Sequence, residues 1–259
     1  MTSVNFDRAA GFYDQTRRLP AGLAEHGLPA LLEWAGPDGR LLEVGVGTGR
    51  IAGPLWERGA RLAGCDISAG MLARLRAKHP QAPVALGDAG RLPFTAGRFQ
   101  VVLTIHVLHL VDGWRGALEE IRRVLAPGGA HVVSWYASDD QAPAHRLREH
   151  WRSQVAARGA VWRRPGVQGA EELLQAVQAL GGRLVRRLDL PADRVPYTPR
   201  AILMDLAGRV YSDAWDVPEA VHAEGVRATE AFALAEYGDL DKPYTETAAH
   251  AWMDFFTYA

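Results

Sequence analysis

The sequence predicts a doubly wound α/β fold, in which a mostly parallel sheet carries helices on both faces. Three observations support this prediction. Strand-like apolar runs alternate with segments whose apolar residues recur at helical spacing. One strand-to-helix junction carries glycines at alternate positions, Gly45, Gly47 and Gly49. Hydrophobic residues make up 48% of the chain, which is enough for a core on each face of a sheet.

The composition narrows the possible classes of function. The chain has 259 residues, which suits one large α/β domain, and a net charge of −1, so no basic field favours nucleic acid. Cys65 is the only cysteine, which leaves no disulfide framework and no thiolate zinc cluster, and we expect no metal. No apolar run has the length of a membrane span, and the first residues do not resemble a secretion signal. We therefore expect a cytoplasmic protein without a membrane partner.

The glycine-rich turn is the most informative stretch. The apolar run Leu41–Val44, with Glu43 inside it, precedes the turn, and helical spacing resumes afterwards at Ile51, Ala52, Leu55 and Trp56. Glycine has no Cβ, so a ligand can lie against bare backbone, and the following helix directs unpaired N–H groups toward the turn. The pattern predicts a cradle for a nucleotide or a carboxylate, although a plain tight turn is an alternative. Its spacing, G-x-G-x-G, differs from the G-x-G-x-x-G of dinucleotide folds.

The other elements follow in chain order. Residues 4–36 show helical apolar spacing, and Gly36–Gly39 forms a turn before the first strand. Gly59 ends the helix after the glycine turn, and Ser68 caps the next one. The expected strands are 61–65, 83–86, 101–105 and 130–136, and a helix is expected over 114–125.

The last part of the chain begins with a change of composition. Residues 137–169 are rich in arginine and include Trp151 and Trp162, and we expect a helical lid inserted after the fifth strand. An RNA-binding surface would combine such charges with stacking aromatic residues, but a solvated helical face is the favoured interpretation. Beyond it we expect helices over 171–180, 199–210 and 218–237 and strands over 183–190 and 248–258.

Two polar residues at strand ends are candidates for function. Asp66 ends the second strand, 17 positions after Gly49. In nucleotide-binding α/β folds an acid at this place accepts both ribose hydroxyls. His106 follows the fourth strand, at the sheet edge where ligands bind, and imidazole is the usual base at neutral pH. His109 is expected to be structural.

Several motifs together resemble the class I S-adenosylmethionine-dependent methyltransferases that act on small molecules. They are the acid and glycines of residues 43–49, the D-x-S-x-x-M-L pattern of 66–72, the G-D-A-x-x-L-P-F pattern of 87–94 and the P-G-G of 127–129. The segment from Phe6 to Asp14 resembles the leading helix of that family, which folds over the cofactor. Gln100 departs from the family pattern, which usually has an acid there.

The resemblance implies a seven-stranded sheet with one antiparallel strand, S-adenosylmethionine as cofactor, and a monomer or homodimer. It implies that Asp66 binds the ribose, that Asp88 binds the adenine amino group beside Ala89, and that Ile67 and Met71 pack on the nucleoside. The predicted cofactor-binding residues are Tyr13, Arg18, Glu43, Gly45, Val46, Gly47, Gly49, Asp66, Ile67, Met71, Gly87, Asp88, Ala89, Ile105 and His106. His106 is also the candidate catalytic residue.

The predicted function is transfer of a methyl group from S-adenosylmethionine to a small molecule by in-line displacement. One domain, 1–259, would carry it, with a helical cap over 1–36 and the lid over 137–169. The chain has no N/D-P-P-Y/F motif after the fourth strand, which speaks against an amine of DNA or protein as acceptor. An RNA methyltransferase, a cofactor-binding regulatory protein without turnover and a nicotinamide-dependent oxidoreductase stay open as alternatives.

Overall fold

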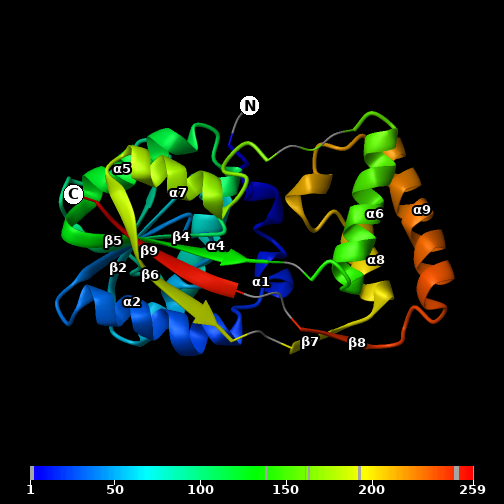
Figure 1. Cartoon of the computed structure of the whole chain (residues 1–259), viewed down its shortest axis with the longest axis horizontal. Helices are drawn as coiled ribbons and strands as arrows, with labels where there is room; N and C mark the ends of the chain where they lie inside the picture. The colour runs from blue at the N-terminus through cyan, green and yellow to red at the C-terminus, as the bar shows by residue number, and fades with distance from the viewer. Residues whose placement is uncertain are drawn as a thin grey trace. The chain divides into compact units, whose positions relative to one another are not determined.

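A computed structural model describes residues 3–137, 139–160, 162, 164–191, 194–247 and 251–258. The chain divides into two compact units (Figure 1). The sheet unit comprises Met1–Tyr136, Arg164–Pro191 and Ala251–Ala259, and the helical unit comprises Ala137–Arg163 and Ala192–His250. Within the described ranges, no helix combines the length and apolar character needed to cross a bilayer.

The sheet unit contains the predicted seven-stranded sheet, with the order β3-β2-β1-β4-β5-β9-β6. Its strands are β1 Arg40–Val44, β2 Arg61–Asp66, β3 Val84–Leu86, β4 Phe99–Ile105, β5 Leu125–Tyr136, β6 Gly182–Leu190 and β9 Ala251–Tyr258. The first five pair in parallel, whereas β9 pairs antiparallel with both β5 and β6. The mostly parallel sheet and its one antiparallel strand are confirmed. Strand order reverses between β1 and β4, which makes their carboxyl ends the expected place for a ligand.

Helices cover both faces of this sheet, as Figure 1 shows for α2 on one face and α5 and α7 on the other. The helices are α2 Leu28–Ala35, α3 Ala52–Glu57, α4 Ala69–Lys78, α5 Trp114–Val124 and α7 Ala170–Ala179. Side chains alternate along each strand, so neighbouring residues enter different cores. Leu41 packs in the core that includes residues of α2, α3 and α4, whereas Leu42 packs in the core that includes residues of α5 and α7.

The N-terminal segment differs from the helix predicted over 4–36. It forms a 3-10 turn η1 at Asp7–Ala9, a single turn α1 at Tyr13–Thr16, and then a π-helical turn η2 at Leu23–Gly27 that continues into α2. The prediction was wrong over residues 4–6 and 17–20, which are not helical. Val4 instead donates its N–H to the carbonyl of Leu110 at 2.9 Å. Pro20 disfavours helical backbone at the residue before it, which fits the break between α1 and η2.

The helical unit contains α6 Pro143–Ala157, α8 Pro199–Ala207, a 3-10 turn at Ser212–Ala214, and α9 Glu219–Tyr237. A two-stranded antiparallel sheet of β7 Arg194–Tyr197 and β8 Tyr244–Thr247, which was not predicted, completes it. Trp151 of α6 is 1% exposed in the core of this unit. A Cβ on Gly225 would lie 2.8 Å from Val155, so this glycine allows α9 to pack closely on α6.

The arginines of α6 form ion pairs within this unit. Arg148 and Arg152 both donate to Oδ2 of Asp213, whose side chain is 3% exposed. Arg146 pairs with Glu236, and Arg158, the residue directly after α6, pairs with Glu224. The helical face was predicted to be solvated, but several of its arginines pair with acids of the same unit.

His131 of β5 is a buried histidine in the core of the sheet unit. Its side chain has no solvent exposure, and its Nε2 lies 2.8 Å from Oγ1 of Thr104 on β4. Burial lowers the pKa of His131 to about 3. An unfolded chain takes up a proton at this side chain below about pH 6.5, and the folded protein does not until the pH falls to about 3. This histidine therefore reduces the free energy of unfolding as the pH falls through that interval.

We predict that His131→Gln makes the protein less sensitive to acid. Between neutral pH and pH 5 the wild type should lose about 2 kcal/mol more free energy of unfolding than the variant. Urea unfolding at both pH values measures this difference. His26→Gln, at an exposed position, is the matched control and should leave the pH dependence unchanged. Equal acid sensitivity of the wild type and His131→Gln would contradict the assignment.

Candidate functional site

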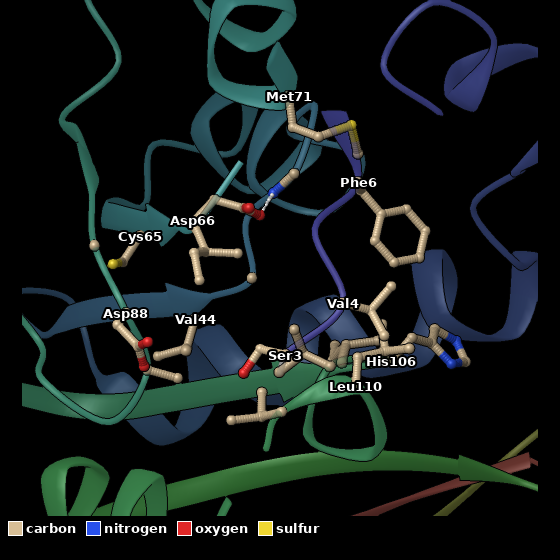
Figure 2. Close-up of a pocket in the computed structure, with 18 of the residues that line it drawn as sticks. Ser3, Val4, Phe6, Val44, Cys65, Asp66, Met71, Asp88, His106 and Leu110 are labelled. Carbon is tan, nitrogen blue, oxygen red and sulfur yellow. Dashed lines mark hydrogen bonds between the residues drawn. The ribbon is translucent and has the colours of Figure 1, made fainter. Parts of the chain in front are cut away.

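A pocket opens at the carboxyl ends of β1, β2 and β4, where the strand order reverses. Eleven of the fifteen predicted site residues line it: Tyr13, Gly45, Gly47, Asp66, Ile67, Met71, Gly87, Asp88, Ala89, Ile105 and His106. They come from segments far apart in the sequence, which meet because parallel strands present their carboxyl ends at one edge. Figure 2 shows the pocket with Asp88 on one side and Phe6 and His106 across from it.

The glycine turn after β1 lines the pocket with Gly45 and Gly47. Gly45, Gly47 and Gly49 have φ values of 78°, 53° and 83°, a region that side chains disfavour. A Cβ on Gly45 would lie 2.1 Å from Cγ2 of Val107, so the turn also packs closely on the segment after β4. The turn is tied to β2, because the N–H groups of Gly45 and Val46 both donate to the carbonyl of Cys65.

Asp66 joins this turn to the start of α4. Its Oδ2 accepts the N–H of Gly47 at 2.7 Å (Figure 2), and its Oδ1 accepts the N–H of Ser68 at 2.8 Å. Burial is the largest influence on this carboxyl group and raises its pKa. A carboxylate has about four acceptor positions, so each oxygen can accept one more hydrogen bond. Asp66 is thus held ready to accept two hydroxyls of one ligand.

Asp88 and Ile67 stand at neighbouring strand ends. Asp88 follows β3, and its Oδ1 accepts the N–H of Gly90 at 2.7 Å. The side chain of Ile67 is 40% exposed, and Met71 lies in the first turn of α4; both line the pocket. An acceptor group beside an apolar slot suits a flat heterocycle that carries an amino group.

His106 follows β4 with a φ of 57°, one of two positive values among described residues other than glycine. Backbone in this region costs about 1–3 kcal/mol and is often found at functional sites. Its ring centroid lies 5.5 Å from that of Tyr136. Burial, with the charges of Arg50 and Arg17 contributing, lowers the pKa of His106 to about 3. The imidazole is therefore neutral at physiological pH and is a weak base.

Four predicted residues do not line the pocket: Arg18, Glu43, Val46 and Gly49. Glu43 is 3% exposed, and burial raises its pKa to about 8, although its Oε2 has no hydrogen-bond partner among the described residues. Val46 points away from the pocket toward Gly64, and a Cβ on Gly49 would lie 3.3 Å from Leu75. The carbonyl of Arg18 accepts a hydrogen bond from Arg50. Whether these four contact a cofactor stays a prediction.

The structure adds lining residues that sequence reasoning missed: Ser3, Val4, Phe6, Val44, Cys65, Val107, Leu110 and Val111. Val44 directly precedes Gly45, and Cys65 directly precedes Asp66. Both could have been predicted from their position at the end of a strand, next to a predicted site residue. The positions of Ser3 and Val4 depend on contacts with residues more than 100 positions away. The N–H of Asp112 donates to Oγ of Ser3 at 3.1 Å, and such a contact has no local sequence signal.

Comparison with known proteins finds similarity to methyltransferases. Residues 42–133 match a family model described as "Methyltransferase domain". A demethylmenaquinone methyltransferase of Beutenbergia cavernae is 34% identical over 145 residues, which cover 55% of this chain and 60% of that protein. The chain thus spans about three fifths of the length of this curated relative.

Solved structures share the fold over most of the chain. The YcgJ protein of Bacillus subtilis has a TM-score of 0.59 and 15% identity, covering 90% of this chain and 99% of that one. A geranyl diphosphate C-methyltransferase of Streptomyces coelicolor, solved with S-adenosyl-L-homocysteine, has a TM-score of 0.52 and 18% identity, covering 92% of this chain and 79% of that one. At these identities the likeness establishes the fold alone.

Proposed function

We propose that this chain, whose residues 42–133 match a methyltransferase family model, transfers a methyl group from S-adenosylmethionine to a small molecule. The reaction is assigned to one domain, 1–259, with a cap over 1–36 and a helical lid over 137–169. A monomer or a homodimer would suffice for it.

The observation that carries this proposal is the arrangement of Asp66 and the glycine turn. Asp66 is fixed by backbone N–H groups of Gly47 and Ser68, and it retains acceptor capacity for the two hydroxyls of a ribose. Asp88 would accept the amino group of adenine, with Ile67 and Met71 against the nucleoside. Gly47 lines the pocket without a side chain, which leaves space for the methionine part of the cofactor. The residues present therefore fit S-adenosylmethionine.

The alternatives fit less well. A nicotinamide dinucleotide calls for a G-x-G-x-x-G turn, which this chain lacks. RNA binding needs a continuous basic surface, whereas three arginines of α6 and Arg158 directly after it pair with acids of their own unit. The methyltransferases compared above include two named for small-molecule acceptors, a demethylmenaquinone and geranyl diphosphate.

The chemistry needs little from the protein beyond positioning. The cofactor supplies an activated sulfonium methyl group, and in-line displacement depends on holding the acceptor at a reactive distance. His106 lines the pocket directly after the carboxyl end of β4, and its ring lies beside that of Tyr136. Because its pKa is about 3, His106 is poorly matched to remove a proton at neutral pH. We propose that it contacts the acceptor and holds it in place.

We predict that the protein binds S-adenosylhomocysteine, and that Asp66→Asn weakens this binding by about 1.5–3 kcal/mol, the range for a hydrogen bond to a charged group. Isothermal titration calorimetry measures the affinity. Asp38→Asn removes the same charge at an exposed turn and should bind as the wild type does. Binding of NAD in place of S-adenosylhomocysteine would contradict the proposal, and unchanged affinity of Asp66→Asn would contradict the ribose assignment.

A second prediction concerns His106. Once an acceptor has been identified from a metabolite panel, His106→Gln should lower the rate of transfer by less than about tenfold at every pH from 6 to 9, because a positioning contact does not titrate there. Cofactor affinity should be nearly unchanged. A loss of about 10²–10⁴-fold, the range for general acid–base catalysis, would instead show that His106 removes a proton.

A further inference from the structure

The N-terminal stretch of residues 3–16, here called the strap, contributes one wall of the pocket. Ser3, Val4, Phe6 and Tyr13 all line the pocket, and Figure 2 shows the strap running along it from Ser3 to Phe6. The function proposed above treats residues 1–36 as a cap and gives no role to the contacts that hold the strap in place. The contacts that hold the strap therefore bear on how a ligand enters and leaves.

Asp7 anchors the strap to the start of α4. Its Oδ1 accepts the hydroxyl of Ser68 at 2.6 Å and the N–H of Gly70 at 2.7 Å. These hydrogen bonds hold the pKa of Asp7 below its usual value, Ser68 being the largest cause. The same Ser68 donates its N–H to Asp66 at 2.8 Å. Ser68 thus connects the strap to the Asp66 carboxylate, which lines the pocket.

This contact is more than a helix cap. The hydroxyl of Ser68 already accepts the N–H of Met71 at 3.0 Å, so α4 has a capping residue of its own. Gly70 leaves the space that Asp7 occupies, since a Cβ there would lie 2.9 Å from Oδ1 of Asp7 and 3.4 Å from Cβ of Ala10. The start of α4 is therefore shaped to receive the strap.

Further contacts hold the two ends of the strap. Val4 bonds to the carbonyl of Leu110, which follows β4. Asp14 accepts the hydroxyl of Thr48, within the glycine turn, at 2.5 Å and pairs with Lys78 of α4 at 2.8 Å. The strap is thus joined to three segments that form the pocket, and Asp7 lies between its two ends.

We propose, on the basis of the function proposed above, that Asp7 is a positioning residue for cofactor binding. It holds the strap against α4 so that the strap closes the pocket over the bound cofactor, and through Ser68 it orients the carboxylate of Asp66. Asp7 itself does not touch the cofactor. Its loss should therefore speed cofactor release, because the strap opens more often.

The test measures the dissociation rate of S-adenosylhomocysteine by stopped-flow displacement. Asp7→Ala should raise this rate about tenfold, corresponding to the lower end of the range for hydrogen bonds to a charged group. Asp7→Asn keeps an acceptor oxygen and should recover most of the slow release. Asp38→Ala is the matched control and should behave as the wild type.

Gly70→Ala separates positioning from stability. Alanine favours a helix over glycine by up to about 1 kcal/mol, so the change should not weaken α4. The added methyl group displaces Asp7, so release should still be faster, and hydrogen exchange should show that cofactor binding no longer protects the amides of residues 3–14. Release at the wild-type rate in both Asp7→Ala and Gly70→Ala would overturn the inference. A wild type that does not bind S-adenosylhomocysteine would overturn the proposed function itself.

Discussion

The hydrogen bond from Gly47 to Asp66 is the interaction on which the site depends. It joins the turn after β1 to the end of β2, two strands that are neighbours in the parallel sheet. The turn can reach Asp66 because Gly47 has a positive φ, and Asp66 stays in place because Ser68 holds its other oxygen. Hydrogen bonds therefore connect the glycine turn to Asp66, the main acceptor group of the pocket. Ser68 extends this connection to Asp7 and the strap.

The sequence was sufficient to predict the elements that local pattern determines. The alternation of strand and helix, the glycine turn and the acids at positions 66 and 88 each have a signal within a few residues, and the structure brings these residues to one pocket. The antiparallel β9 followed from family resemblance, because its position between β5 and β6 is set by pairing over long distances. Eleven of the predicted residues line the pocket, most of them because parallel strands present their carboxyl ends at one edge of the sheet.

What could not be predicted depends on contacts between distant residues. Helical apolar spacing suggested a helix at residues 4–6, but hydrogen bonds with the segment after β4 hold Val4 in the strap. The two-stranded sheet of β7 and β8 pairs segments that are separated by the whole of α8 and α9. Asp213 gave no sign in the sequence that it would receive both Arg148 and Arg152.

The pocket combines fixed hydrogen-bond acceptors with two groups, Cys65 and His106, whose pKa values lie far from neutrality. Burial raises the pKa of Cys65 to about 12 and lowers that of His106 to about 3. Glu43, behind the turn, has a pKa of about 8 but does not line the pocket. Neither Cys65 nor His106 is matched to proton removal at neutral pH, whereas the fixed acceptors suit the holding of an already activated donor beside an acceptor.

The most direct test of this account is a crystal structure of the protein with S-adenosylhomocysteine. The account predicts that both ribose hydroxyls lie within about 3.2 Å of the Asp66 carboxylate oxygens. It also predicts that the adenine lies between Ile67 and the Asp88 segment and that the strap lies closed over the ligand. A nucleoside bound away from Asp66, or a ligand found outside this pocket, would contradict it.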